Sequence, residues 1–156
     1  MKHFFLLLSG WALVAGCGAD SVQNLPTPAT GDDKSTIHYI VNGRTITQEA
    51  RLSYQPATPP TRNFDVLNIE AGDTARSSGG PYVQVVFLKG AGRPESEYGV
   101  VAIRYFDPTT SLTWGIGPRG TLGRWNGGWR GSFSGVADDR LGPARALIEG
   151  EFINVR

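Results

Sequence analysis

The sequence predicts an all-β fold, an antiparallel β-sandwich or small β-barrel of about 7–9 strands. The first observation is that short apolar runs recur along the chain and are closed by turn residues, in a sequence with 21 glycines and 10 prolines. The second is that every stretch with an apolar stripe at helical spacing is interrupted by Gly or Pro. Helix is therefore expected to be limited to about one turn.

The domain is expected to begin with a β-hairpin. Apolar and polar side chains alternate from Thr36 to Val41, and Asn42-Gly43 follows. This dipeptide favours a type I′ turn, because both of its positions need a positive φ. With the return strand at 44–50, one face of the hairpin is apolar and the other carries His38 and Thr47.

The middle of the domain is expected to contain three further strands, each bounded by turn residues. A loop with several prolines separates them from the first hairpin, because proline cannot donate to a central ladder. We expect the loop at 55–62 and the strands at 64–70, 82–88 and 98–106.

A second hairpin is expected in the last third, with strands at 121–125 and 129–136. Asn126-Gly127-Gly128 between them is interpreted as a three-residue loop, which places Trp125 opposite Trp129. Alternation puts Trp129 on the same face as the aromatic ring four residues later, and Arg130 on the opposite face. We therefore expect Trp129 to be buried and Trp125 to be exposed.

The closing strand is expected at 144–156. Alternation places Ile148, Gly150 and Phe152 on one face and two glutamates on the other. A glycine inside a strand marks a β-bulge or a close backbone contact, so we expect one of these at Gly150.

The N-terminal segment predicts export and anchoring. A short basic start precedes the apolar run Phe4–Val14, which is too short to cross a hydrocarbon core of about 30 Å. Residues 13–17, Leu-Val-Ala-Gly-Cys, resemble the lipobox of bacterial lipoproteins. The resemblance implies cleavage after Gly16 and acylation of Cys17. The alternative is an ordinary buried thiol behind a non-lipidated signal.

The chain is thus expected to have three parts: a cleaved signal peptide at 1–16, a lipidated N-terminus and flexible tether at 17–35, and a single all-β domain at 36–156. Two or three acyl chains make a lasting anchor. Glycine rather than aspartate at position 18 implies, by resemblance to enterobacterial sorting, the outer membrane, on either its periplasmic or its surface face.

Composition narrows the class of partner. The formal net charge is +1, which argues against nucleic acid as an electrostatic partner. With Cys17 acylated no thiol remains, so the domain is expected to fold without disulfides. We expect a monomeric domain without cofactor or metal, and with the lipid bilayer as its partner through Cys17.

Catalytic motifs fail on geometry. Residues 115–120 match G-x-G-x-x-G, but Pro118 and the strand that follows remove the helix which phosphate binding needs. His38 could serve a Ser-His-Asp site, although a solvent-facing strand histidine is the preferred interpretation. Glu149 and Glu151 are likewise interpreted as residues of a solvent-exposed strand face rather than as the paired carboxylates of a glycosidase.

The last third also interleaves tryptophan with arginine. Aromatic faces beside guanidinium groups suit sugar rings or a protein partner. The alternative is that the tryptophans fill the core of a domain without disulfides. The candidate binding residues are Trp114, Arg119, Arg124, Trp125 and Arg130.

Both ends of the domain resemble a loose group of small lipoproteins from Bacteroidetes. The similarity lies in the lipobox, the tether, the early Asn-Gly and the strand pair at 130–135 and 148–152. It implies an all-β domain on a lipid anchor and no particular activity. The sequence therefore predicts a non-catalytic, membrane-anchored cell-envelope domain. The alternatives are a glycan- or protein-binding module, for example an envelope inhibitor, and a hydrolase.

Overall fold

The computed structural model describes residues 34–73, 80–107, 111–114, 117–138 and 145–156. All of them belong to one compact unit, Asp32–Arg156. The predicted signal peptide, Cys17 and nearly all of the predicted tether lie outside the described residues. For 111–114, and at 137, 138, 145 and 146, only the backbone is described.

The structure confirms the all-β prediction, with nine strands in one antiparallel sheet of order β6-β5-β4-β3-β2-β1-β9-β8-β7. A single turn of 3-10 helix, η2 (Glu95–Glu97), is the only helix in the described part of the chain. The strands are β1 (Thr36–Val41), β2 (Arg44–Gln55), β3 (Phe64–Ala71), β4 (Tyr82–Gly90), β5 (Gly99–Phe106), β6 (Ser111–Trp114), β7 (Arg119–Trp125), β8 (Gly128–Asp138) and β9 (Arg145–Val155).

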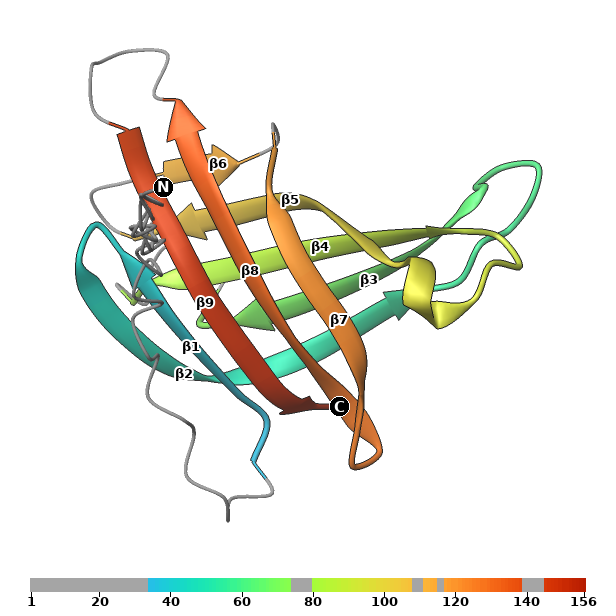
Figure 1. The fold of residues 1–156 in the computed structure, drawn as a ribbon, viewed down its shortest axis with the longest axis horizontal. Coiled ribbons are helices and arrows are strands. Elements are labelled where there is room, and N and C mark those ends of the chain that lie inside the picture. Colours follow the sequence, from blue (N-terminus) through green and yellow to red (C-terminus); the bar gives the residue numbers. More distant parts are fainter. Residues whose placement is uncertain (1–33, 74–79, 108–110, 115–116, 139–144) are drawn as a thin grey trace, which may run out of the picture. The chain divides into compact units, whose positions relative to one another are not determined.

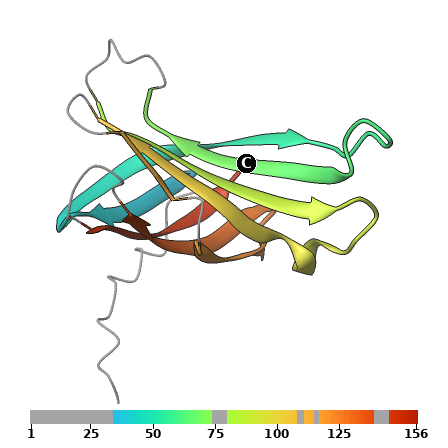
Figure 2. The same cartoon turned by 90° about the horizontal axis from the view of Figure 1, so that it is seen from above.

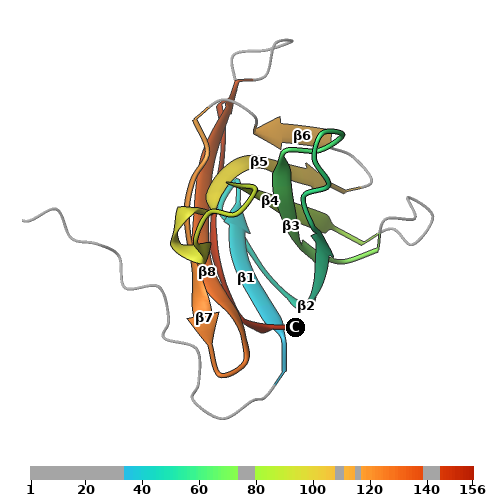
Figure 3. The same cartoon turned by 90° about the vertical axis from the view of Figure 1, so that its right-hand side faces the viewer.

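Strand β2 folds the sheet onto itself. Its first part, 44–49, pairs with β1, and its second part, Ala50 to Gln55, pairs with β3. Strands β1, β9, β8 and β7 therefore form one wall, and β3 to β6 form the other (Figure 1), which Figure 2 shows as two layers. On the remaining side β5 and β6 approach β7 and β8 (Figure 3). Of the two predicted architectures, the sheet is thus a nearly closed barrel.

The first hairpin has the predicted register. Val41 faces Arg44 and Tyr39 faces Ile46. The turn residues Asn42 and Gly43 have φ values of 50° and 79°, as a type I′ turn requires. The return strand continues to Gln55 rather than ending at Ala50, because its second part pairs with β3.

The second hairpin has a tighter turn than predicted. Asn126-Gly127 alone forms the loop, with φ values of 47° and 79°, and Gly128 is already the first residue of β8. Trp125 therefore pairs with Gly128, and Trp129 pairs with Arg124. The prediction that the two tryptophans face each other is wrong. Gly128 is needed for a different reason, since the backbone of β9 lies 3.0 Å from where its Cβ would be.

The interior face carries the buried apolar side chains of the strands. Phe87 and Phe152 meet edge to face at 5.9 Å and join the two walls. At Gly150 a Cβ would lie 2.5 Å from the carbonyl oxygen of His38, so the predicted close contact is confirmed. The largest fully buried side chains are Tyr39, Tyr105, Phe87, Phe152, Ile37, Leu67, Ile69, Ile103, Ile148, Val83 and Val85.

Candidate functional site

The hairpin of β7 and β8 carries one tryptophan–arginine pair on each face. Alternation puts Arg124 on the inner face of β7, and Trp125 on the outer face. On β8 the inner residue is Trp129 and the outer one is Arg130. Trp129 is 4% exposed and Trp125 is 45% exposed, so both burial predictions are confirmed.

The outer pair lies beside a shallow hollow of about 440 Å³. The guanidinium carbon of Arg130 is 5.3 Å from the centroid of the Trp125 ring, within the usual range of cation–π contacts. Gly123, opposite Arg130, lines the hollow and leaves it open, because nothing lies within 4 Å of where its Cβ would be. Beyond it, the hydroxyl oxygens of Thr121 and Ser132 are 2.9 Å apart.

A third strand contributes a carboxylate to this outer hollow. Glu151 of β9 pairs with Ser132 and is half-buried. A guanidinium group, two hydroxyls and a carboxylate thus line the hollow, and the exposed Trp125 ring lies beside the guanidinium group of Arg130. All of them are held on strands, so little reorganisation is needed for binding.

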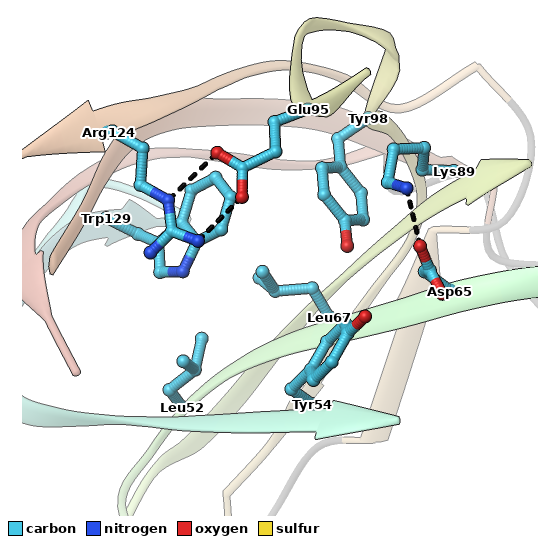
Figure 4. A pocket seen from close by; sticks show the side chains of 9 residues that line it. All are labelled: Leu52, Tyr54, Asp65, Leu67, Lys89, Glu95, Tyr98, Arg124 and Trp129. Carbon is cyan, nitrogen blue, oxygen red and sulfur yellow. Dashed lines mark hydrogen bonds and ion pairs between the residues drawn. The ribbon is translucent and has the colours of Figure 1, made fainter. Parts of the chain in front are cut away.

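The inner pair is closed by a carboxylate. The Arg124 guanidinium lies 3.9 Å from the Trp129 ring centroid and donates two hydrogen bonds to Glu95 of η2, of 2.9 Å and 2.6 Å (Figure 4). Tyr98 meets Trp129 edge to face at 5.8 Å. Because β5 and β7 are not hydrogen-bonded neighbours, these contacts hold the two walls together across the seam of the barrel.

A second ion pair lies on the opposite wall. Lys89 Nζ is 2.5 Å from Asp65 Oδ2, and the two side chains are only 9% and 12% exposed. Lys89 also donates to the carbonyl oxygen of Arg93, and Asp65 accepts from the backbone N–H of Ala57. The pair therefore ties the β2–β3 and β4–β5 loops to the barrel.

Between the two ion pairs lies a cavity of about 270 Å³ (Figure 4). Leu52, Leu67 and Tyr54 form its apolar side. The ion pairs form its polar side, with Tyr98 and Trp129 between them.

The two carboxyl groups of the cavity are ionised at neutral pH. The hydrogen bonds from Arg124 lower the pKa of Glu95. The hydrogen bonds from Lys89 and from a backbone N–H lower the pKa of Asp65. Burial raises the pKa of Tyr98 to about 12, so its hydroxyl stays protonated and can donate a hydrogen bond.

The predicted binding residues do not form one cluster. Trp125 and Arg130 lie together on the outer face. Arg119 shares that face but lies at the opposite end of β7, about 20 Å away along an extended strand. Arg124 lies on the inner face with Glu95, with its side chain 55% exposed. Trp114 ends β6, and its side chain lies outside the described part of the chain.

The cavity itself was not predicted from the sequence. One signal pointed to it, since Lys89 continues the inward-facing series Val83, Val85 and Phe87 and so places a charge at an interior position. Its carboxylate partner is 24 residues away, on a strand whose register depends on the fold.

The residues considered for catalysis lie on the outer face. His38 Nδ1 is 2.7 Å from Thr47 Oγ1, and its other cross-strand neighbour is Glu151. His38 lines neither of the two cavities described above. Across the described ranges, no group of three or more His, Cys, Asp or Glu side chains could hold a metal ion.

The glycine motif runs into a strand. Arg119 and Gly120 already belong to β7, so no helix follows the motif, as predicted. Gly115 and Ile116 of the motif lie outside the described residues.

Comparisons with protein-family models, with curated proteins and with solved structures gave no match to this chain. Among the residues that the structure describes, no helix has the length and apolar character to cross a membrane. A function for this chain must therefore be inferred from the geometry of the β7–β8 hairpin.

Proposed function

We propose that this chain is a lipid-anchored protein of the bacterial cell envelope, whose non-catalytic barrel binds glycan on the outer face of the β7–β8 hairpin. The observation that carries the glycan part is the exposed Trp125 ring, with Arg130 beside it, next to the open hollow over Gly123. An exposed aromatic ring packs against the apolar face of a sugar, while nearby polar groups bind its hydroxyls.

The polar groups around the hollow favour a polyol. Arg130 donates and Glu151 accepts. The hydroxyls of Thr121 and Ser132 bond each other, which leaves one O–H to donate and lone pairs to accept. Every sugar hydroxyl both donates and accepts, so it needs such a mixture. Arg130 and Glu151 balance in charge, and Arg124, which also lines the hollow, is paired with Glu95. This balance favours a neutral ligand over a strongly charged one.

The anchor part of the proposal rests on the resemblance of residues 13–17 to a lipobox. A polar tether of the length of 18–34 has a reach of roughly 20 to 25 Å, enough to hold a domain clear of lipid headgroups. We expect Cys17→Ala to accumulate as unprocessed precursor and to lose incorporation of labelled fatty acid. Recovery of wild type as a soluble protein cleaved at another position would contradict the anchor.

The glycan part is tested with the full-length protein in phosphatidylcholine nanodiscs and a panel of envelope glycans, including peptidoglycan fragments and lipopolysaccharide O-chains. Wild type should bind at least one member. Trp125→Ala should weaken that binding more than tenfold, as loss of a central aromatic contact does. The matched control is Arg119→Ala, on the same face but outside the hollow, which should bind like wild type.

Two results would contradict the glycan part. One is that no glycan of the panel binds, which would leave a structural envelope domain or a protein partner. The other is an equal loss of binding in Trp125→Ala and Arg119→Ala, which would show that the hollow is not the site.

A further inference from the structure

We propose that the cavity on the inner side of the hairpin is a second binding site, for a small organic carboxylate with an apolar or aromatic body. Tyr54 is 51% exposed and the side chain of Glu95 is 50% exposed, so the cavity opens to solvent at its rim. Its volume of about 270 Å³ lies just below the range of roughly 300 to 1,000 Å³ that is typical of ligand pockets. It therefore suits a molecule of about one ring rather than a lipid chain.

The hydrogen bonds of the lining use every carboxylate oxygen but not every donor. Both carboxylate oxygens of Glu95 already accept from Arg124. Both oxygens of Asp65 also accept, one from Lys89 and one from a backbone N–H. Arg124 has five N–H groups and uses two of them in these bonds.

The Tyr98 hydroxyl is a further donor. It has no hydrogen-bond partner among the described residues, and Figure 4 shows it directed toward Leu67 and Tyr54. Burial keeps it protonated, because it raises the pKa of Tyr98 to about 12. A carboxylate can accept from this hydroxyl and from the remaining N–H groups of Arg124, in charge-assisted hydrogen bonds.

Other ligand classes fit this lining less well. A cation would find each carboxylate already engaged with Lys89 or Arg124. A sugar would leave most of its own O–H donors without an acceptor, because the donors of the lining outnumber its free acceptors. The apolar surface of Leu52, Leu67 and Tyr54 instead suits a hydrocarbon body.

The probe is benzoate, titrated by calorimetry into the full-length protein in nanodiscs at neutral pH. Benzyl alcohol and benzylamine carry the same ring with a neutral and a cationic head. We expect saturable binding of one benzoate per chain and at least tenfold weaker binding of the other two. Tyr98→Phe removes only the hydroxyl and should weaken benzoate roughly tenfold. Arg130→Gln is the control on the outer face and should bind benzoate like wild type.

The proposal is overturned if folded wild type shows no saturable benzoate binding, if the three probes bind equally, or if Tyr98→Phe keeps wild-type affinity. Should Tyr98→Phe not fold, Leu52→Trp provides the second test, because it fills the cavity and must reduce benzoate binding. Glycan binding is measured on the same samples. Loss of one activity with retention of the other shows which of the two sites is wrong.

Discussion

The inner pair, Trp129 with Arg124, and the outer pair, Trp125 with Arg130, consist of the same two residue types on one hairpin. Inside, the guanidinium lies 3.9 Å from the ring and is held by Glu95. Outside, the distance is 5.3 Å, and Arg130 makes no ion pair with the described residues. The residue types are the same, so the difference comes from the burial of Trp129 and from Glu95, which binds Arg124. The inner pair therefore closes the barrel, while the outer pair stays open to a ligand.

The largest expected effect comes from the inner ring. Trp129→Ala removes a side chain that is 4% exposed and contacts both Arg124 and Tyr98. It should lower the free energy of unfolding by about 3 to 5 kcal/mol, a large part of the stability of an ordinary domain. Chemical denaturation followed by circular dichroism measures this. If Trp125→Ala destabilised the protein as much, the distinction between the two pairs would be lost.

The two ion pairs of the cavity extend the comparison to charge. Asp65→Asn leaves the buried ammonium of Lys89 without its carboxylate and should cost about 3 kcal/mol. The control is Glu95→Gln in the half-exposed pair with Arg124, which should cost less than about 1 kcal/mol and less still at high salt. Thermal denaturation of both variants at two salt concentrations gives the answer. Equal costs would mean that burial does not separate the two pairs.

Acid should weaken the two ion pairs that line the cavity. The folded-state pKa values of Asp65 and Glu95 lie below their ordinary values, because Lys89 and Arg124 favour the charged forms. Their stabilising contribution is therefore fully present above about pH 5 and is lost as the pH falls through the lowered values. We expect the melting temperature to fall below about pH 5, and to fall less in Asp65→Asn. An identical acid response in that variant would assign the effect to other carboxyl groups.

Sequence patterns predicted which side chains of a strand point inward better than they predicted which residues pair between strands. Asn42-Gly43 fixed the first hairpin, because the turn and the alternation require the same register. Alternation along β8 also predicted the burial of Trp129. The second turn was predicted one residue too long, since Gly128 looks like a loop residue although it serves close contact with β9.

The cavity depends on information that local patterns do not contain. Arg124 and Glu95 are 29 residues apart and meet only because the sheet curls until its edges approach. Strand β6, with the range Ser111–Trp114, was missed because four residues are too few to show an alternating pattern. Closure of a sheet is a property of all its strands, so the residues that it brings together cannot be identified one strand at a time.

The smallest expected effect on stability gives the sharpest test of the outer face. Gly123 lies in a strand with open space where its Cβ would be, so Gly123→Val meets no steric barrier. Because valine is preferred to glycine in strands, the free energy of unfolding should stay unchanged or rise by at most about 1 kcal/mol.

The new side chain nevertheless fills the hollow beside Trp125, so the glycan bound by wild type should be lost. Ser134→Val is the control, since it adds a similar side chain to the same outer face beside Arg119 rather than in the hollow. The melting temperature and the glycan binding of both variants are measured against wild type. A Gly123→Val protein that binds glycan like wild type would place the binding surface elsewhere and leave Trp125 exposed without a function.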